Sequence, residues 1–161
     1  MKKLFLSIIM LICSIGHAQE KKTETIITSV DSVPFYAEKY RELSKAIQFT
    51  TCKAMRVSYV YLDGSQMRLD KINKLRQSII SDYERGITFA ELANRYTMDG
   101  LKDGDLNWFD QGMMVKVFED AILAHKKSDI FAVDIPDEKW YYVVLKTYDD
   151  VKKVRMEIEL D

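Results

Sequence analysis

The hydrophobic pattern of this chain changes its period twice, and this change limits the fold more than any other feature. Residues 55–62 alternate apolar side chains between two faces, which predicts a strand. Over residues 65–85 the apolar positions recur every three or four residues, which predicts one long helix ended by Gly86. Alternation returns after residue 130. A strand, a run of helices and a final meander predict an α+β domain, with about three to four helices around a small, mostly antiparallel sheet.

Caps and turns place the remaining elements. Thr88 and Glu91 have the spacing of a capping box, so a second helix is expected through Tyr96. Pro136 and Asp137 predict the turn of a late hairpin. The other expected elements are a short extended piece at 106–109, a helix at 115–124, hairpin strands at 130–135 and 140–148, and a last strand at 154–160.

The first 18 residues have the pattern of a secretory signal peptide. Two lysines precede an almost unbroken apolar run, and small residues follow it before a cleavage site. The run is shorter than the roughly 20 residues that a bilayer span requires, so we expect cleavage and no remaining membrane span. Residues 19–54 are expected to form a polar tether with a short amphipathic helix after Pro34. Residues 55–149 would form the domain, and residues 150–161 a C-terminal strand extension.

Composition excludes several kinds of site. Without residues 1–18 the chain loses two of its 24 basic residues and none of its 25 acidic ones. The resulting net charge of −3 offers no general basic field to a nucleic acid. Cys52 and His125 are then the last thiol and imidazole, so we expect no intrachain disulfide and no zinc site built from Cys and His. Cys52 is expected to be buried, and His125 to cap the helix that it follows.

Three ordered blocks carry more specific information. They read FAELANRYT at residues 89–97, GDLNWF at 104–109, and GMMV at 112–115 followed by FEDAI at 118–122. This order resembles the parvulin-type peptidyl-prolyl cis-trans isomerases from about Met55 to Thr147. The resemblance implies a parvulin-like form of the α+β fold and an enzyme that turns X-Pro bonds between cis and trans. It implies no cofactor and no metal, because catalysis needs only tighter binding of the twisted amide.

The resemblance also assigns a substrate-binding cup. Carried over by position, its walls would be Leu106, Phe109, Met114 and Phe118. Without the motif, apolar residues at these spacings would indicate ordinary core. The flexible thioether of Met114 favours a pocket that accepts differing chains.

The polar half of the site departs from the family pattern. Relatives commonly carry two histidines where this chain has Tyr59 and Tyr142, and Asp99 stands where they carry Cys or Asp. The resemblance places these three residues at the catalytic centre. Tyrosine hydroxyls there would donate hydrogen bonds to Asp99 or to a substrate carbonyl. The alternatives are that both tyrosines fill sheet surface and that Asp99 is a solvated loop carboxylate.

Two functions follow from the resemblance and the signal. The first is an exported isomerase, in the periplasm or cell envelope of a bacterium, that assists folding of proline-containing polypeptide clients as a monomer. The second is a catalytically degenerate peptide-binding or chaperone module of the same fold, because both usual histidines are tyrosine.

Overall fold

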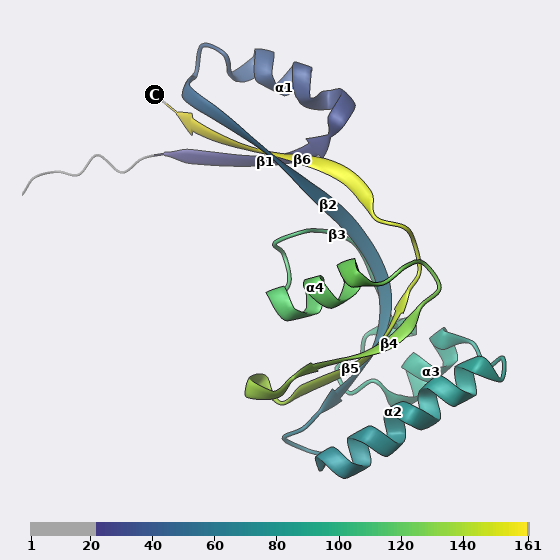
Figure 1. Cartoon of the computed structure of the whole chain (residues 1–161). Helices are drawn as coiled ribbons and strands as arrows, with labels where there is room; N and C mark the ends of the chain where they lie inside the picture. The colour runs from purple at the N-terminus through teal and green to yellow at the C-terminus, as the bar shows by residue number, and fades with distance from the viewer. Residues whose placement is uncertain (1–21, 161) are drawn as a thin grey trace, which may run out of the picture.

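One long strand, β2 (Ser44–Asp63), connects the two halves of the molecule (Figure 1). The computed structural model describes residues 22–160, so the predicted signal peptide lies outside the described residues. Within that range the sheet has the strand order β1-β6-β2-β5-β4, with β3 paired to β2, and every pair is antiparallel. The predicted α+β fold with a mostly antiparallel sheet is therefore confirmed.

The lower half in Figure 1 is a sheet with helices on both faces. Because side chains alternate across a strand, Val60 and Leu62 of β2 face one side, and Met55 and Val57 face the other. All four are fully buried. Two helices pack on the first side and one on the second. The elements of this half are α2 (Leu69–Glu84), α3 (Phe89–Tyr96), β3 (Asp105–Asp110), α4 (Lys116–Ala124), β4 (Ile130–Ile135) and β5 (Trp140–Lys146).

Local interactions position α2 and α3. The Thr88 hydroxyl accepts the Glu91 N–H at 3.3 Å, and the Glu91 carboxylate accepts the Thr88 N–H at 3.2 Å, which confirms the predicted capping box. α2 begins at Leu69 rather than at residue 65. The cause is a turn in which the Asp63 carboxylate accepts the Ser65 N–H at 2.7 Å, so the chain enters the helix later.

The upper half overturns the predicted tether. Strands β1 (Thr23–Ser29) and β6 (Val151–Leu160) form a sheet with the first part of β2, and α1 (Val33–Tyr40) packs against it. The short helix predicted after Pro34 forms as α1 and ends at Tyr40, while Ile47 already lies on β2 opposite Ile158. The expected boundary at residue 55 therefore falls inside a continuous strand.

The physical reason for this error is that the upper sheet has one covered face. Met156 and Ile158 are fully buried beneath α1, where they pack with Tyr40 of that helix. Gln48 and Thr50 lie on the opposite face, where exposed polar residues are tolerated. A polar, Thr-rich strand of this kind shows little hydrophobic alternation in its own sequence, so it is recognised as a strand only from its pairing with β6.

Cys52 and His125 both lie outside the candidate cavity described below. Cys52 lies in β2 and is buried, as expected. His125 follows α4, where its Nδ1 lies 2.7 Å from the Ala121 carbonyl oxygen and its ring stacks on Phe131 with a centroid distance of 3.7 Å. No helix between residues 22 and 160 is both long and apolar enough to cross a membrane.

Candidate functional site

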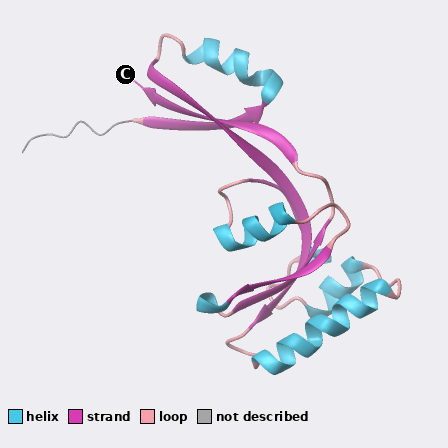
Figure 2. Cartoon of the chain, viewed as in Figure 1, coloured by secondary structure: helices cyan, strands magenta, loops and turns pink. Residues whose placement is uncertain are grey.

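An apolar cavity of about 240 Å³ lies between α4 and the sheet. Figure 2 shows α4 on the side of the sheet opposite α2 and α3. The walls come from β2, β3, β5, α4 and the loop that precedes α4, so elements far apart in the sequence meet here. The lining residues are Tyr59, Leu106, Met113, Met114, Val115, Phe118, Trp140 and Tyr142.

The structure brings together most of the predicted cup. Leu106, Met114 and Phe118 line the cavity. Phe109 does not, because its side chain is only 4% exposed and packs in the underlying core beside Met55. The sequence reasoning missed Met113, Val115 and Trp140, which line the cavity as well. Met113 and Val115 are neighbours of Met114 in the GMMV block, so that block was the available signal.

The two predicted tyrosines face each other across neighbouring strands. Tyr142 lies opposite Tyr61 and diagonal to Tyr59, which places all three rings on one face of the sheet. The rings of Tyr59 and Tyr142 are perpendicular, with centroids 5.5 Å apart. Phe118 approaches Tyr142 at 5.1 Å from the α4 side. The tyrosines therefore form an aromatic wall of the cavity.

Asp99 is exposed, but its carboxylate has a defined orientation. Tyr59 donates its hydroxyl to one carboxylate oxygen at 2.7 Å. The Thr97 hydroxyl and the Leu101 N–H donate to the other oxygen at 2.8 and 3.1 Å. Thr97 is itself held by the Tyr61 N–H at 3.1 Å. The predicted tyrosine–aspartate contact thus forms, and Thr97 is an additional residue that orients it.

Burial keeps both cavity tyrosines protonated. Burial raises the pKa of Tyr59, and the hydrogen bond to Asp99 raises it further. Burial also raises the pKa of Tyr142 to about 12, with smaller contributions from Tyr61 and Asp99. Both hydroxyls are therefore hydrogen-bond donors at neutral pH. Within residues 22–160 the Tyr142 hydroxyl has no hydrogen-bond partner, so its proton is available to a ligand.

A buried carboxylate holds the loop that forms the cavity rim. Glu119 is 5% exposed, and its Oε1 accepts the N–H groups of Gly112 and Met114 at 2.8 and 2.9 Å. Its Oε2 lies 2.9 Å from the same Gly112 nitrogen. The sequence reasoning did not assign this role to Glu119, because an acidic residue in the first turn of a helix is common.

The described residues show no arrangement suited to a metal. Between residues 22 and 160, no three side chains of His, Cys, Asp or Glu gather into a group that would hold an ion. The cavity itself is lined by apolar side chains and by the phenol groups of Tyr59 and Tyr142, and the Asp99 carboxylate accepts the Tyr59 hydroxyl.

Comparisons with known proteins match most of the chain to one family. Residues 40–147 match a protein-family model described as the PPIC-type PPIASE domain. The chain is 32% identical to Foldase protein PrsA 1 of Bacillus cereus over 136 residues, which is 82% of this chain and 44% of that protein. It is also 32% identical to Foldase protein PrsA of a Geobacillus species over 100 residues, which is 58% of this chain and 36% of that protein. The chain spans less than half the length of the curated relatives it matches.

A solved structure shares the fold. The peptidylprolyl isomerase PrsA of Bacillus anthracis aligns with a TM-score of 0.50 and 24% identity. The alignment covers 61% of this chain and 42% of that one.

Proposed function

Because the chain belongs to the family of PPIC-type peptidyl-prolyl isomerase domains, we propose that it accelerates cis-trans isomerisation of X-Pro bonds in exported polypeptides. The observation that carries this proposal is the cavity formed by Leu106, Met114 and Phe118 beside the two tyrosines. Its apolar walls suit a proline ring, and its size suits one residue rather than a large ligand. Export is the further part of the proposal, and it rests on the signal pattern of residues 1–18.

Catalysis in such a cup requires no covalent step. The uncatalysed barrier of ~18–20 kcal/mol comes from lost amide resonance, so the rate rises if the twisted amide is bound more tightly than either planar form. A planar amide carries the larger charge separation. Transfer from water to an apolar cavity therefore destabilises the planar amide more than the twisted one.

The two tyrosines of the aromatic wall have separate roles in this proposal. Tyr59 donates to Asp99, so its hydroxyl is occupied and fixes the position of the aromatic wall. Tyr142 lines the cavity with a protonated hydroxyl, and we assign it the contact to the substrate carbonyl. Tyr142 stands at a position where relatives commonly carry a histidine.

The second candidate function is a peptide-binding or chaperone module that does not catalyse. The specific observation that favours it is the same Tyr59–Asp99 hydrogen bond, because it removes one donor from the reacting bond. Under this alternative the cavity binds proline and leaves its isomerisation rate unchanged.

The test measures isomerisation of a proline peptide by two-dimensional exchange NMR with purified folded protein. Met114→Ala enlarges the cavity and should lower the exchange rate. Val117→Ala is the matched control, because Val117 lies on the same helix but is 55% exposed and outside the cavity. Peptide binding without faster exchange would favour the binding module, and no binding at all would exclude both functions.

A further inference from the structure

The upper half of β2 has an unpaired edge. β6 pairs with residues 44–54 on one side of the strand, and β3 pairs with residues 54–58 on the other. The last bond on the β3 side runs from the Gln111 N–H to the Lys53 carbonyl at 2.8 Å. Near the other end of β2, Thr97 and Met98 hydrogen-bond to Tyr61. Among residues 22–160, no strand covers the β3 side of β2 before Lys53.

The alternation of strand geometry identifies which groups face this edge. The carbonyl of Lys53 points toward β3, and residues two apart in a strand direct their main-chain groups to the same side. The register with β6 is regular from Ala46 to Ala54. The N–H and C=O groups of Phe49 and Thr51 therefore point away from β6, toward the open edge.

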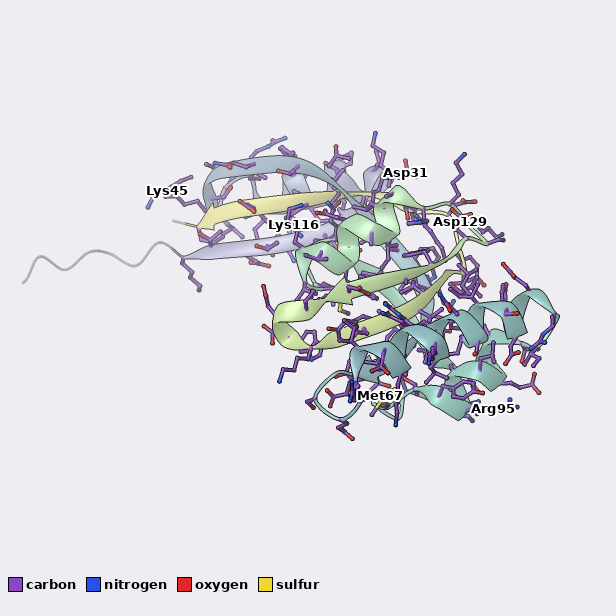
Figure 3. All side chains as sticks on the ribbon, turned by 60° about the horizontal axis from the view of Figure 1, so that its bottom comes forward. Asp31, Lys45, Met67, Arg95, Lys116 and Asp129 are labelled. Carbon is purple, nitrogen blue, oxygen red and sulfur yellow. The ribbon has the colours of Figure 1, made fainter. Side chains whose placement is uncertain are left out.

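Between residues 46 and 52 this edge lacks the usual protection against strand addition. Edge strands are commonly blocked by proline, bulges or inward charges. Lys45, which is labelled in Figure 3, lies at a register shift near the start of β2. The residues that follow it are uncharged up to Lys53. Phe49 is 53% exposed beside the edge. The segment is thus available to another extended chain.

A second cavity joins this edge to the candidate site. It measures about 360 Å³, and its lining includes Thr50, Thr51, Arg155 and Met114. Met114 also lines the apolar cup, so the two cavities share a wall. Lys116, which lines the second cavity at the start of α4, is labelled in Figure 3. A chain that leaves the cup past Met114 would reach the open edge of β2 without crossing the core.

The charges in this second cavity suit a polypeptide main chain. Lys116 is paired with Asp120, and Glu119 is occupied by the loop N–H groups. Arg155 donates to the Gln111 carbonyl and forms no ion pair within residues 22–160. The cavity therefore carries a cation without a carboxylate partner, and it favours carbonyl oxygens or an acidic side chain.

We propose that the client segment flanking the bound proline adds to the open edge of β2 as an extended strand along residues 47–51. The occupant is the same polypeptide that places its proline in the cup, so this inference rests on the proposed function. Main-chain hydrogen bonds supply affinity without demanding a sequence, which suits a protein that serves many clients.

The experiment compares three labelled peptides by fluorescence anisotropy with the full folded protein. The first has about four residues around one proline, the second extends it to about ten, and the third is the longer one with N-methyl groups on the flanking residues. We expect the second peptide to bind about tenfold more tightly than the first, the effect of one or two net hydrogen bonds. N-methylation should remove that gain, because it removes the donors.

A protein variant gives an independent test. Thr51→Pro removes an N–H that faces the open edge and leaves the bonds to β6 in place, whereas Thr51→Val keeps the N–H. The gain for the longer peptide should vanish in Thr51→Pro and persist in Thr51→Val. The N-methyl comparison uses the unmodified protein, so it decides the question even if Thr51→Pro fails to fold.

The outcomes separate this inference from the proposed function. If the short peptide binds and the longer one gains nothing, or the gain survives N-methylation, edge addition is wrong and the cup stands. If neither peptide binds, both proposals fail. Light scattering is measured in parallel, and a dimer that dissociates in Thr51→Pro would assign the edge to a second copy and overturn the client as occupant.

Discussion

The carboxylate of Glu119 offers the sharpest test of how the cavity rim is held. It is almost fully buried and accepts the N–H groups of Gly112 and Met114. Glu119→Ala leaves both donors without an acceptor, at about 1–3 kcal/mol each. We therefore expect the free energy of unfolding to fall by about 2–6 kcal/mol.

Glu119→Gln is the more informative variant because it preserves size. Its one carbonyl oxygen can still accept both N–H groups from the position of Oε1, but the bonds lose the assistance of the charge. Charged hydrogen bonds are worth about 1.5–3 kcal/mol and neutral ones about 0.5–1.5, so each bond loses about 1–1.5 kcal/mol and we expect a total loss of about 2–3 kcal/mol. Affinity for a proline peptide should fall as well, because Met113 and Met114 lose their support.

Urea denaturation followed by tryptophan fluorescence measures the stability, and peptide titration measures the affinity. Asp120→Asn is the matched control. Its side chain is exposed and, among residues 22–160, pairs only with Lys116, so the change should stay within about 0.5 kcal/mol. If Glu119→Gln proves as stable as Asp120→Asn and binds peptide normally, the carboxylate does not hold the rim and the reasoning is refuted.

Three further predictions concern the cap, the tyrosine and a close backbone contact. Thr88→Ala removes the cap of α3 and should lower the free energy of unfolding by about 1 kcal/mol in urea denaturation; an unchanged midpoint would contradict the capping box. Burial raises the pKa of Tyr59 above its ordinary value of 10.0. The folding stability that the protonated Tyr59 hydroxyl contributes is therefore fully present below about pH 10 and is lost as pH rises further. Tyr59→Phe should therefore flatten the loss of stability above about pH 10, by up to about 1.4 kcal/mol per pH unit, and an equally steep loss would be inconsistent with the shift. Gly104→Ala should destabilise more than Gly100→Ala: both have positive φ, but only at Gly104 would the added Cβ lie 2.5 Å from the Tyr59 carbonyl oxygen, and equal midpoints in thermal denaturation would argue against that clash.

Short-range signals predicted the lower half of the fold well. The capping box at Thr88 and the hairpin turn after Ile135 each depend on residues within one turn of each other, so their energetics are present in the local sequence. Leu106, Met114 and Phe118 were predicted through the motif blocks, and all three line one cavity. Whether they act on proline stays a proposal.

The errors share a different cause. The expected tether failed because β1 and the first part of β2 gain their stability from β6, which lies at the other end of the chain. Phe109 was placed in the cup because its spacing fits, but spacing does not distinguish a wall from the layer beneath it. In both cases the outcome depends on which distant segment packs against a residue, and the local sequence does not contain this information.

The sequence by itself determined the order of strands and helices from Met55 onward, because that order depends on periodicity and on local caps. Its three motif blocks indicated the family and the apolar character of the cup. Only the tertiary structure decided which groups meet across long separations. Of the two tyrosines expected near Asp99, the structure pairs Tyr59 with it, 40 residues away in the chain, and leaves the Tyr142 hydroxyl without a partner within residues 22–160. The open edge of β2 likewise exists only because β3 ends at Asp110 while β2 continues. Such features depend on how far two segments that are distant in the sequence extend along each other in the fold. A local pattern of residues does not contain that information.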